Sequence, residues 1–180
     1  VLDVRALGSD KSEASVSGAA SSVRALEGGT VTFMTFNVKQ LIGSVDVKRA
    51  RATAAYVLGC KADVVMFQEL FDERAREAMV EAMGVAYDFV VARAGADMGS
   101  SLEDSGLAIF VRGPRVHPVP GTATFHAYKK GVGSDRLAGK GIVSLQLQVA
   151  GGRITILNTH MQAHVGKAYA DARTVQLETL

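Results

Sequence analysis

The chain has 180 residues, of which 48% are hydrophobic and 21% charged, and it carries a formal net charge of +2 at pH 7. This size and composition are typical of one globular domain. The near-neutral charge, without a dense Lys/Arg cluster, argues against a nucleic-acid-binding surface, and no apolar run reaches the roughly 20 residues of a transmembrane helix.

The first part of the chain, residues 1–29, differs in composition from the rest. Its run GSDKSEASVSGAASS is rich in Ser, Ala and Gly and contains no aromatic residue. Burial in such a segment does not offset the entropy cost of ordering it. We therefore predict a flexible leader over residues 1–29, with at most a short helix near 19–26. The chain begins at Val1, so we expect any signal peptide to be absent or already removed.

Hydrophobic periodicity in residues 30–180 predicts alternating strands and helices of an α/β domain. The predicted helices are residues 46–59, between the possible caps Asp46 and Gly59, residues 73–84, and residues 171–180. The predicted strands are residues 31–36, 62–67, 87–93, 105–112 and 122–128, with a hairpin of residues 141–150 and 153–160 around a Gly-Gly turn. The first strand–helix–strand unit is a crossover, so its two strands should run parallel.

Polar residues follow three of the predicted strands. Asn37 follows strand 31–36 and Glu69 follows strand 62–67, so the parallel arrangement brings both to the same edge of the sheet. His160 closes the apolar strand that contains ITIL. Because ligands of α/β sheets bind outside the carboxyl ends of the strands, this amide, carboxylate and imidazole outline a site.

Each of these three residues has two possible interpretations from the sequence alone. Glu69 stands where an apolar strand ends, and a buried charge without a partner costs several kcal/mol. It is either a structural residue, as a buried acid bonded to backbone amides or a surface residue if the strand ends early, or a ligand of a hard divalent cation. Asn37 either closes a turn or belongs to a site, and His160 is either a structural or a catalytic histidine.

The other candidate residues are assigned structural roles. Cys60 is the single cysteine, which excludes an intrachain disulfide, and we expect it to be a small apolar residue after a helix. His164 lies four residues after His160, but the segment between them does not have a helical pattern, so a zinc pair is not expected. His117 and His126 are expected to be structural or exposed. Lys129, Lys130 and Lys140 are expected to form a basic rim.

The order of the short motifs along the chain is more specific than any one of them. They are TFNVKQL (35–41), RA (49–50), DVVMFQELFD (63–72), LEDSGLAIFVR (102–112), YKKGVGSDRLAGKGIV (128–143), NTHMQA (158–163) and RTVQL (173–177). Over residues 31–180 this series resembles the endonuclease/exonuclease/phosphatase superfamily and, within it, the neutral bacterial-type sphingomyelinases. The ELFD, EDSG, GKG and THMQA segments are similar to the phospholipase C branch in particular.

The resemblance implies a mixed-sheet sandwich of the DNase I-like type and a metal-dependent phosphodiesterase that cleaves sphingomyelin to ceramide and phosphocholine. It implies that Glu69 is the carboxylate ligand of a central Mg²⁺, or of another divalent cation, and that Asn37 helps to hold this centre. His160 matches the histidine that bonds the scissile phosphate. The implied substrate is a phospholipid at a membrane surface, and a secreted or membrane-peripheral location is favoured.

The same resemblance implies a second metal site at the edge of the molecule. Glu73, Glu103 and Asp104 fall where secreted members build it, although Glu73 departs from the asparagine expected there. The late Asp-x-Asn strand and the Ser-Asp-His segment, which carries the family's general base, have no match in the chain. We therefore expect the N-terminal portion of the fold, incomplete at its C-terminus and inactive by itself.

Two alternative functions stay open. One is a nuclease or an inositol-phosphate phosphatase of the same superfamily; the lack of a basic stripe argues against the nuclease, because phosphate contacts need Lys and Arg. The other is a non-catalytic gene fragment, which the missing late motifs favour for the isolated chain. The sequence does not specify the lipid head group or the oligomeric state.

Overall fold

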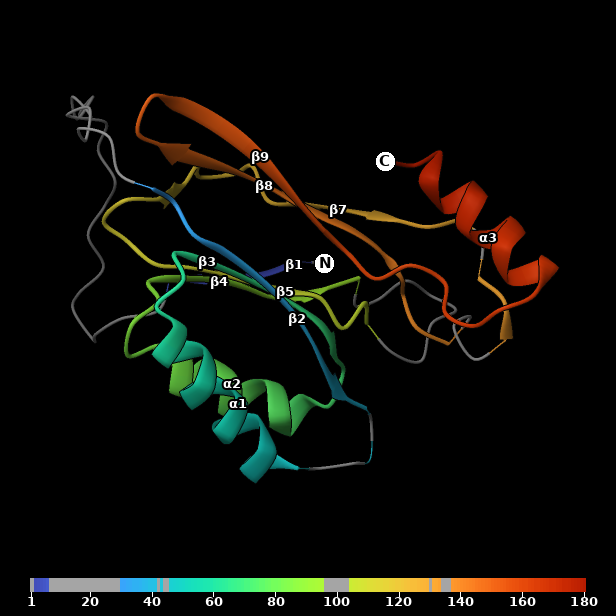
Figure 1. The fold of residues 1–180 in the computed structure, drawn as a ribbon, viewed down its shortest axis with the longest axis horizontal. Coiled ribbons are helices and arrows are strands. Elements are labelled where there is room, and N and C mark those ends of the chain that lie inside the picture. The colour runs from blue at the N-terminus through green and yellow to red at the C-terminus, as the bar shows by residue number, and fades with distance from the viewer. Residues whose placement is uncertain are drawn as a thin grey trace.

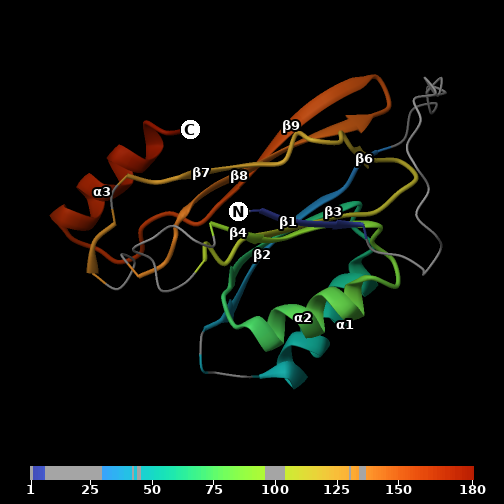
Figure 2. The ribbon, with the colours of Figure 1, turned by 180° about the vertical axis from the view of Figure 1, so that it is seen from behind.

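The computed structural model describes residues 2–6, 30–41, 43, 46–95, 104–129, 131–133 and 137–180. Two β-sheets pack face to face, and helices α1 and α2 cover the outer face of one of them (Figures 1 and 2). Helix α3 lies at one end of the molecule, on the side of the second sheet (Figure 1). None of the helices within these ranges is both long and apolar enough to span a bilayer.

The first sheet is mixed and has the strand order β1-β4-β5-β3-β2. Strands β2 and β3 run parallel, whereas the other neighbouring strands are antiparallel. Helix α1 connects β2 to β3, which confirms the predicted crossover. The strands are β1 (Leu2–Ala6), β2 (Phe33–Gln40), β3 (Val64–Leu70), β4 (Phe89–Ala94) and β5 (Ala108–Val111).

Both helices on the first sheet begin at a capping aspartate. Asp46 accepts a hydrogen bond from the N–H of Arg49 at the start of α1 (Val47–Cys60), as predicted, and Asp72 caps α2 (Glu73–Met83). Helix α1 does not close at Gly59 as predicted. It continues to Cys60, an exposed residue, and ends because Lys61 adopts the left-handed conformation, with φ of 55°.

The second sheet is built around β8. Strand β8 (Gly141–Val149) pairs antiparallel with β6 (His117–Pro118), β7 (Thr124–Ala127) and β9 (Gly152–Thr159). The predicted Gly-Gly turn joins β8 to β9. Gly141, in the GKG segment, lets β7 approach closely, because a Cβ there would lie 2.3 Å from the main-chain oxygen of His126.

The core has two parts, one on each face of the first sheet. Between this sheet and its helices lie side chains such as Phe67, Met79 and Phe110, all fully buried. Between the two sheets lie Ile109 and Leu147, among others. Burying each large aliphatic side chain stabilises the fold by about 1.5 to 3 kcal/mol. The α/β sandwich expected from the sequence is thus formed, with α3 (Lys167–Leu177) beginning four residues earlier than predicted.

The prediction of a flexible leader is wrong for residues 2–6. These residues form β1 and pair antiparallel with β4, from Leu2 opposite Ala94 to Ala6 opposite Phe89. The unpaired main-chain groups at the edge of β4 form hydrogen bonds with this strand. Its five residues are too few to show a hydrophobic pattern that would predict a strand. Arg5 adds a bond to Glu77 of α2, at 3.1 Å. Residues 7–29, with the helix suggested near 19–26, lie outside the described residues.

A buried carboxylate, Asp63, joins the beginnings of β2 and β3. It accepts hydrogen bonds of 2.8 Å from both the N–H and the hydroxyl of Thr32, and Arg115 donates to it at 2.8 Å. Burial by itself would raise the pKa of Asp63. The bonds from Thr32 and Arg115 outweigh this effect and hold the pKa below its usual value.

Replacing this carboxylate should destabilise the protein in a pH-dependent way. We expect Asp63→Asn to lower the free energy of unfolding by about 2 kcal/mol at pH 7, because charge-assisted hydrogen bonds are lost. The pKa of Asp63 is lower in the folded chain than in the unfolded chain, where it is about 3.9. The stabilisation by the carboxylate is therefore fully present at pH values above the unfolded-state pKa, and it is lost as the pH falls through the folded-state pKa. Urea unfolding of both proteins at neutral and at acidic pH measures the difference, and a difference that does not shrink in acid would contradict the assignment.

Candidate active site at the strand ends

Three polar side chains from different strands meet at one end of the sandwich. Asn37 lies on β2, Glu69 on β3, and His160 directly follows β9. The side-chain amide of Asn37 donates to Oε1 of Glu69 at 2.8 Å, and Nε2 of His160 lies 3.4 Å from the same oxygen. The structure thus brings together the amide, carboxylate and imidazole that the sequence placed at strand ends.

Glu69 reaches this position through an irregular backbone. Val65 and Phe67 face the helices, and regular alternation would send Glu69 to the same side. Instead Glu69 adopts φ of 56°, and Leu70 takes the place on the helix side, where it is fully buried. A left-handed conformation at a non-glycine residue costs on the order of 1–3 kcal/mol and persists only where the surroundings hold it. Such strain is typical of a functional position.

The carboxylate of Glu69 is only partly buried. Its side chain is 19% exposed and that of His160 is 20% exposed, so both lie at the rim rather than inside the core. Glu69 extends β3 beyond the predicted end at residue 67, and Asn37 likewise lies within β2. Glu69 therefore lies partly exposed at the end of the core, because the backbone irregularity turns its side chain away from the helix side.

Asn158 of β9 joins the two sheets beside this site. Its side chain is buried, and its Nδ2 donates to the main-chain oxygens of Phe67 (2.9 Å) and Ala108 (3.0 Å), which face each other in the first sheet. Its Oδ1 accepts from the amide of Gln68 at 2.7 Å. Asn158 therefore fixes the end of β9 two residues before His160.

The sequence interpretation gave Asn158 no role, although a signal was present. The inward-facing positions of β9 are Ile154 and Ile156, and Asn158 is the next residue in the same alternation. A polar residue at an apolar position of a strand needs hydrogen-bond partners inside the protein. That break in the pattern could have identified Asn158.

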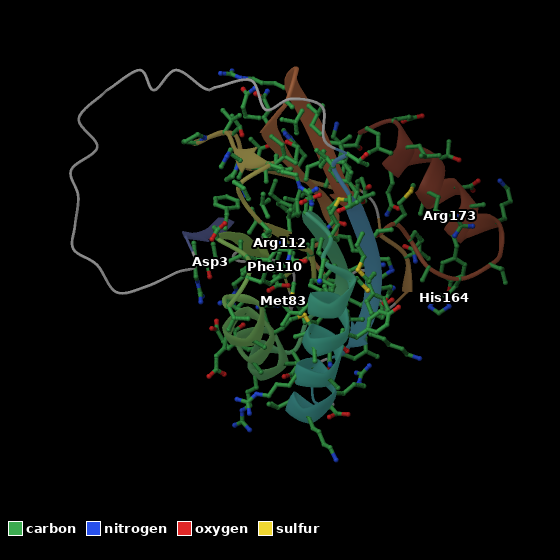
Figure 3. All side chains as sticks on the ribbon, turned by 60° about the vertical axis from the view of Figure 1, so that its left-hand side comes forward. Asp3, Met83, Phe110, Arg112, His164 and Arg173 are labelled. Atoms are coloured by element: carbon green, nitrogen blue, oxygen red, sulfur yellow. The ribbon has the colours of Figure 1, made fainter. Side chains whose placement is uncertain are left out.

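Three arginines, one from each long helix, hold the main chain just after each site residue. Arg49 of α1 donates to the main-chain oxygens of residues 38 and 39, at 2.9 and 2.7 Å. Arg76 of α2 donates to those of residues 70 and 71, at 2.8 and 3.1 Å. Arg173 of α3 donates to those of residues 162 and 164, at 3.1 and 2.8 Å. Figure 3 shows Arg173 and His164 together on the α3 side of the molecule.

The segment after His160 has two further supports. Gln176 of α3 accepts a hydrogen bond from the N–H of Gln162 at 2.8 Å. Lys140 donates to the main-chain oxygen of Met161 at 3.0 Å. The motifs THMQA and RTVQL are therefore in direct contact, through Gln162 and Gln176. The sequence interpretation gave RTVQL no role.

The expected basic rim is wrong for Lys140, whose side chain is buried because its ammonium group bonds the chain beside the site. Lys129 is exposed, and Lys130 lies outside the described residues. His117 and His126 are exposed, as expected. His164 packs against the ring of Tyr169, with 5.4 Å between the ring centroids.

The donor set at the strand ends fits a magnesium ion. Mg²⁺ is usually bound through one or two carboxylates while it keeps several waters. Both contacts that Glu69 makes with the described part of the chain use Oε1, which leaves Oε2 available to another ligand. Among these residues no cluster of three or more His, Cys, Asp or Glu side chains forms an all-protein metal cage. One carboxylate with an amide beside it therefore suits a partly hydrated ion.

The proposed second metal site has a different composition. Glu73 and Asp104 come together, but they do so around the guanidinium group of Arg76, which lies 2.7 Å from Glu73 and 2.6 Å from Asp104. Glu103 lies outside the described residues. The two described carboxylates do not by themselves fit a metal ion at this edge, because the guanidinium group of Arg76 lies between them.

Comparison with curated proteins finds bacterial sphingomyelinases. No family model matches the chain. A sphingomyelinase C of Bacillus cereus is 26% identical over 175 residues, which covers 86% of this chain and 51% of that protein, and a second sphingomyelinase C of Bacillus cereus is also 26% identical. The chain is homologous to bacterial sphingomyelinase C over about 85% of its length, and it spans about half the length of these relatives.

Solved structures share the fold over a similar range. Sphingomyelinase C from Streptomyces griseocarneus superimposes with a TM-score of 0.72 at 22% identity, over 83% of this chain and 56% of that one. A variant of beta toxin from Staphylococcus aureus with bound magnesium ions gives 0.71 at 22%, over 82% and 56%. TDP2 of D. rerio, complexed with a single-strand DNA product, gives 0.61 at 19%, over 82% and 52%. These likenesses confirm the DNase I-like α/β sandwich.

Removing the amide that joins the sheets should cost stability. We expect Asn158→Leu to lower the free energy of unfolding by about 3 kcal/mol, because the amide of Gln68 and two main-chain oxygens lose a buried partner. Urea unfolding measures this loss. Thr155→Ala, at an exposed position of the same strand, is the matched control and should change stability little. A variant Asn158→Leu as stable as the parent protein would show that the contact does not hold the sheets together.

Proposed function

We propose that these residues form part of the active site of a metal-dependent phosphodiesterase of the sphingomyelinase type, which hydrolyses sphingomyelin to ceramide and phosphocholine. The observation that carries the proposal is the meeting of Asn37 and His160 at one carboxylate oxygen of Glu69. The homology to sphingomyelinase C supports a phospholipid at a membrane surface as the substrate. The proposal concerns the whole protein, of whose relatives the chain spans about half.

A divalent cation, Mg²⁺ in the first place, would be held by Glu69 with the amide of Asn37 beside it. When bound, such an ion supplies positive charge that neutralises and orients a phosphodiester. The available Oε2 of Glu69 supports this assignment, as does the beta toxin structure with bound magnesium ions.

Asn37 fixes the direction of the carboxylate. Its Nδ2 donates to Glu69, while its Oδ1 accepts a hydrogen bond of 3.1 Å from the N–H of Lys39. Both ends of the amide are therefore engaged, and Arg49 holds the main chain that follows. The carboxylate is thus oriented before any ligand arrives, which lowers the reorganisation that binding requires.

His160 would act on the phosphate. Its Nε2 lies beside the carboxylate, so a phosphodiester placed at Glu69 would come within reach of the imidazole. A positioned N–H that donates to a phosphate oxygen stabilises the negative charge that develops there, an effect worth about 10² to 10³ in kcat for a single donor. Asn158 and Arg173 fix the chain on either side of the ring.

Changing the carboxylate should remove metal-dependent hydrolysis. In the whole protein, we expect Glu69→Gln to lower Mg²⁺-dependent release of phosphocholine from sphingomyelin vesicles by at least about 100-fold, because the ion loses its charged ligand. Calorimetry should show weaker Mg²⁺ binding by the same variant. An unchanged rate with an unchanged response to chelator would refute the ligand role.

Changing the histidine should separate chemistry from metal binding. In the whole protein, we expect His160→Ala to lower kcat by about 10² to 10³ while Mg²⁺ affinity, measured by calorimetry, stays the same. His126→Ala removes an exposed histidine on β7 and is the matched control, with no expected effect. Full activity of His160→Ala would remove His160 from the site.

A substrate panel distinguishes the alternatives. Faster hydrolysis of single-stranded DNA or of an inositol phosphate than of sphingomyelin would favour a nuclease or a phosphatase of the same superfamily. Mg²⁺ binding by the whole protein without hydrolysis of any of the three would favour the non-catalytic alternative.

A further inference from the structure

A buried arginine occupies the edge of the molecule where the family resemblance places a second metal ion. Arg76 is 2% exposed, and its guanidinium group contacts oxygen atoms from three segments. It donates to the main-chain oxygens of Leu70 and Phe71, at 2.8 and 3.1 Å, in the turn between β3 and α2. It also lies 2.7 Å from Glu73 in the first turn of α2 and 2.6 Å from Asp104 before β5.

These oxygens are the kind that a hard cation would bind. Ca²⁺ takes carboxylate and main-chain oxygens as ligands, whereas a guanidinium group offers five N–H donors in a planar fork and satisfies the same acceptors. The other oxygen of Asp104 accepts a hydrogen bond of 2.7 Å from the N–H of Gly106. Burial raises the pKa of Asp104, while the charge of Arg76 and the N–H of Gly106 oppose that rise.

Among the residues that the structure describes, the charges at this edge balance without a metal ion. Arg93 approaches the same two acids, at 3.6 Å from Asp104 and 3.9 Å from Glu73. Within the described residues the two arginines and the two carboxylates therefore cancel. An added divalent cation would have to displace a buried guanidinium or leave the cluster with excess positive charge, and an uncompensated buried charge is costly.

The turn that Arg76 holds begins directly after Glu69. Leu70 is the residue that follows the strained backbone of Glu69, and its N–H also donates to the main-chain oxygen of Gly106 at 2.9 Å. Gly106 is required here, because a Cβ would lie 2.7 Å from the ring of Phe71. The guanidinium group of Arg76 thus connects Asp104 to Leu70, the residue that directly follows Glu69.

We infer that the guanidinium group of Arg76 takes the place of the second metal ion that the family resemblance implies at this edge. Arg76 thereby holds the turn after Glu69 without a divalent ion. Arg76 is a positioning residue, since it touches neither the amide nor the imidazole of the site. Its role does not depend on the proposed hydrolysis, because metal binding and thermal unfolding of the 180-residue chain report it directly.

The test removes the arginine and asks whether calcium takes its place. All proteins carry Glu69→Gln, so that the central carboxylate does not bind the ion. We expect CaCl₂ to leave the Tm of Glu69→Gln unchanged. Adding Arg76→Ala should lower Tm by about 10 °C, because two carboxylates lose their partner, and CaCl₂ should restore most of that loss, with binding visible by calorimetry. Adding Asp104→Asn to this double variant should abolish the rescue.

Matched controls separate this effect from a change of net charge. Arg74→Ala removes an exposed arginine two residues earlier on the same helix and should create no response to calcium. If Arg76→Ala does not fold, Arg76→Lys keeps the charge but not the fork, and it should show a smaller loss of Tm with a smaller calcium rescue.

Two results would overturn the inference. One is a calcium-dependent rise in Tm of Glu69→Gln that Glu73→Gln removes, since it would mean that a metal ion binds this edge beside Arg76. The other is a folded Arg76 variant, with Ala or with Lys, that calcium neither binds nor stabilises, since Arg76 would then be a packing residue only.

Discussion

The arrangement of the site depends on one buried side-chain amide that connects the two sheets. Asn158 of the second sheet uses its amide to bond Phe67 and Ala108, which are partners in the first sheet, and accepts from Gln68. A buried amide destabilises the fold unless its polar groups are hydrogen-bonded. A shift of one sheet relative to the other would break these hydrogen bonds and therefore cost free energy. This requirement fixes β9 against β3 and brings His160 to Glu69. Shape complementarity of apolar side chains alone would specify the register less strictly.

A second constraint acts on the strand ends themselves. The pairing of β2 and β3 becomes irregular after Asn37, and Glu69 has a left-handed backbone, so regular sheet pairing does not continue beyond the site residues. The helices hold the main chain that follows them. Each sends one guanidinium group to main-chain oxygens just beyond one site residue, namely Arg49 after Asn37, Arg76 after Glu69 and Arg173 after His160. The planar fork of arginine suits this task, because one group bonds two carbonyls at once.

The sequence predicted the meeting of the site residues better than it predicted their supports. The crossover rule placed Asn37 and Glu69 at one edge, since it depends only on the order strand, helix, strand. The supports depend on contacts between distant residues, such as Arg76 with Asp104, and an arginine within a helix has no local pattern that separates it from a solvated one. Strand β1 was missed for the same reason, because its partner β4 lies more than 80 residues later. The direction of the Glu69 side chain was not predictable from the sequence, because one left-handed residue breaks the alternation of β3.

Paramagnetic relaxation by Mn²⁺ tests most directly whether the three strand ends form one cation site. Mn²⁺ added in small amounts to the isotope-labelled protein broadens the NMR signals of nuclei close to the bound ion. We expect the side-chain amide of Asn37 and the backbone amides of Glu69 and His160 to broaden first and together, with the signals near Arg76 affected later. Broadening that begins around Glu73 and Asp104, or that reaches Glu69 but not His160, would contradict a single site at the strand ends.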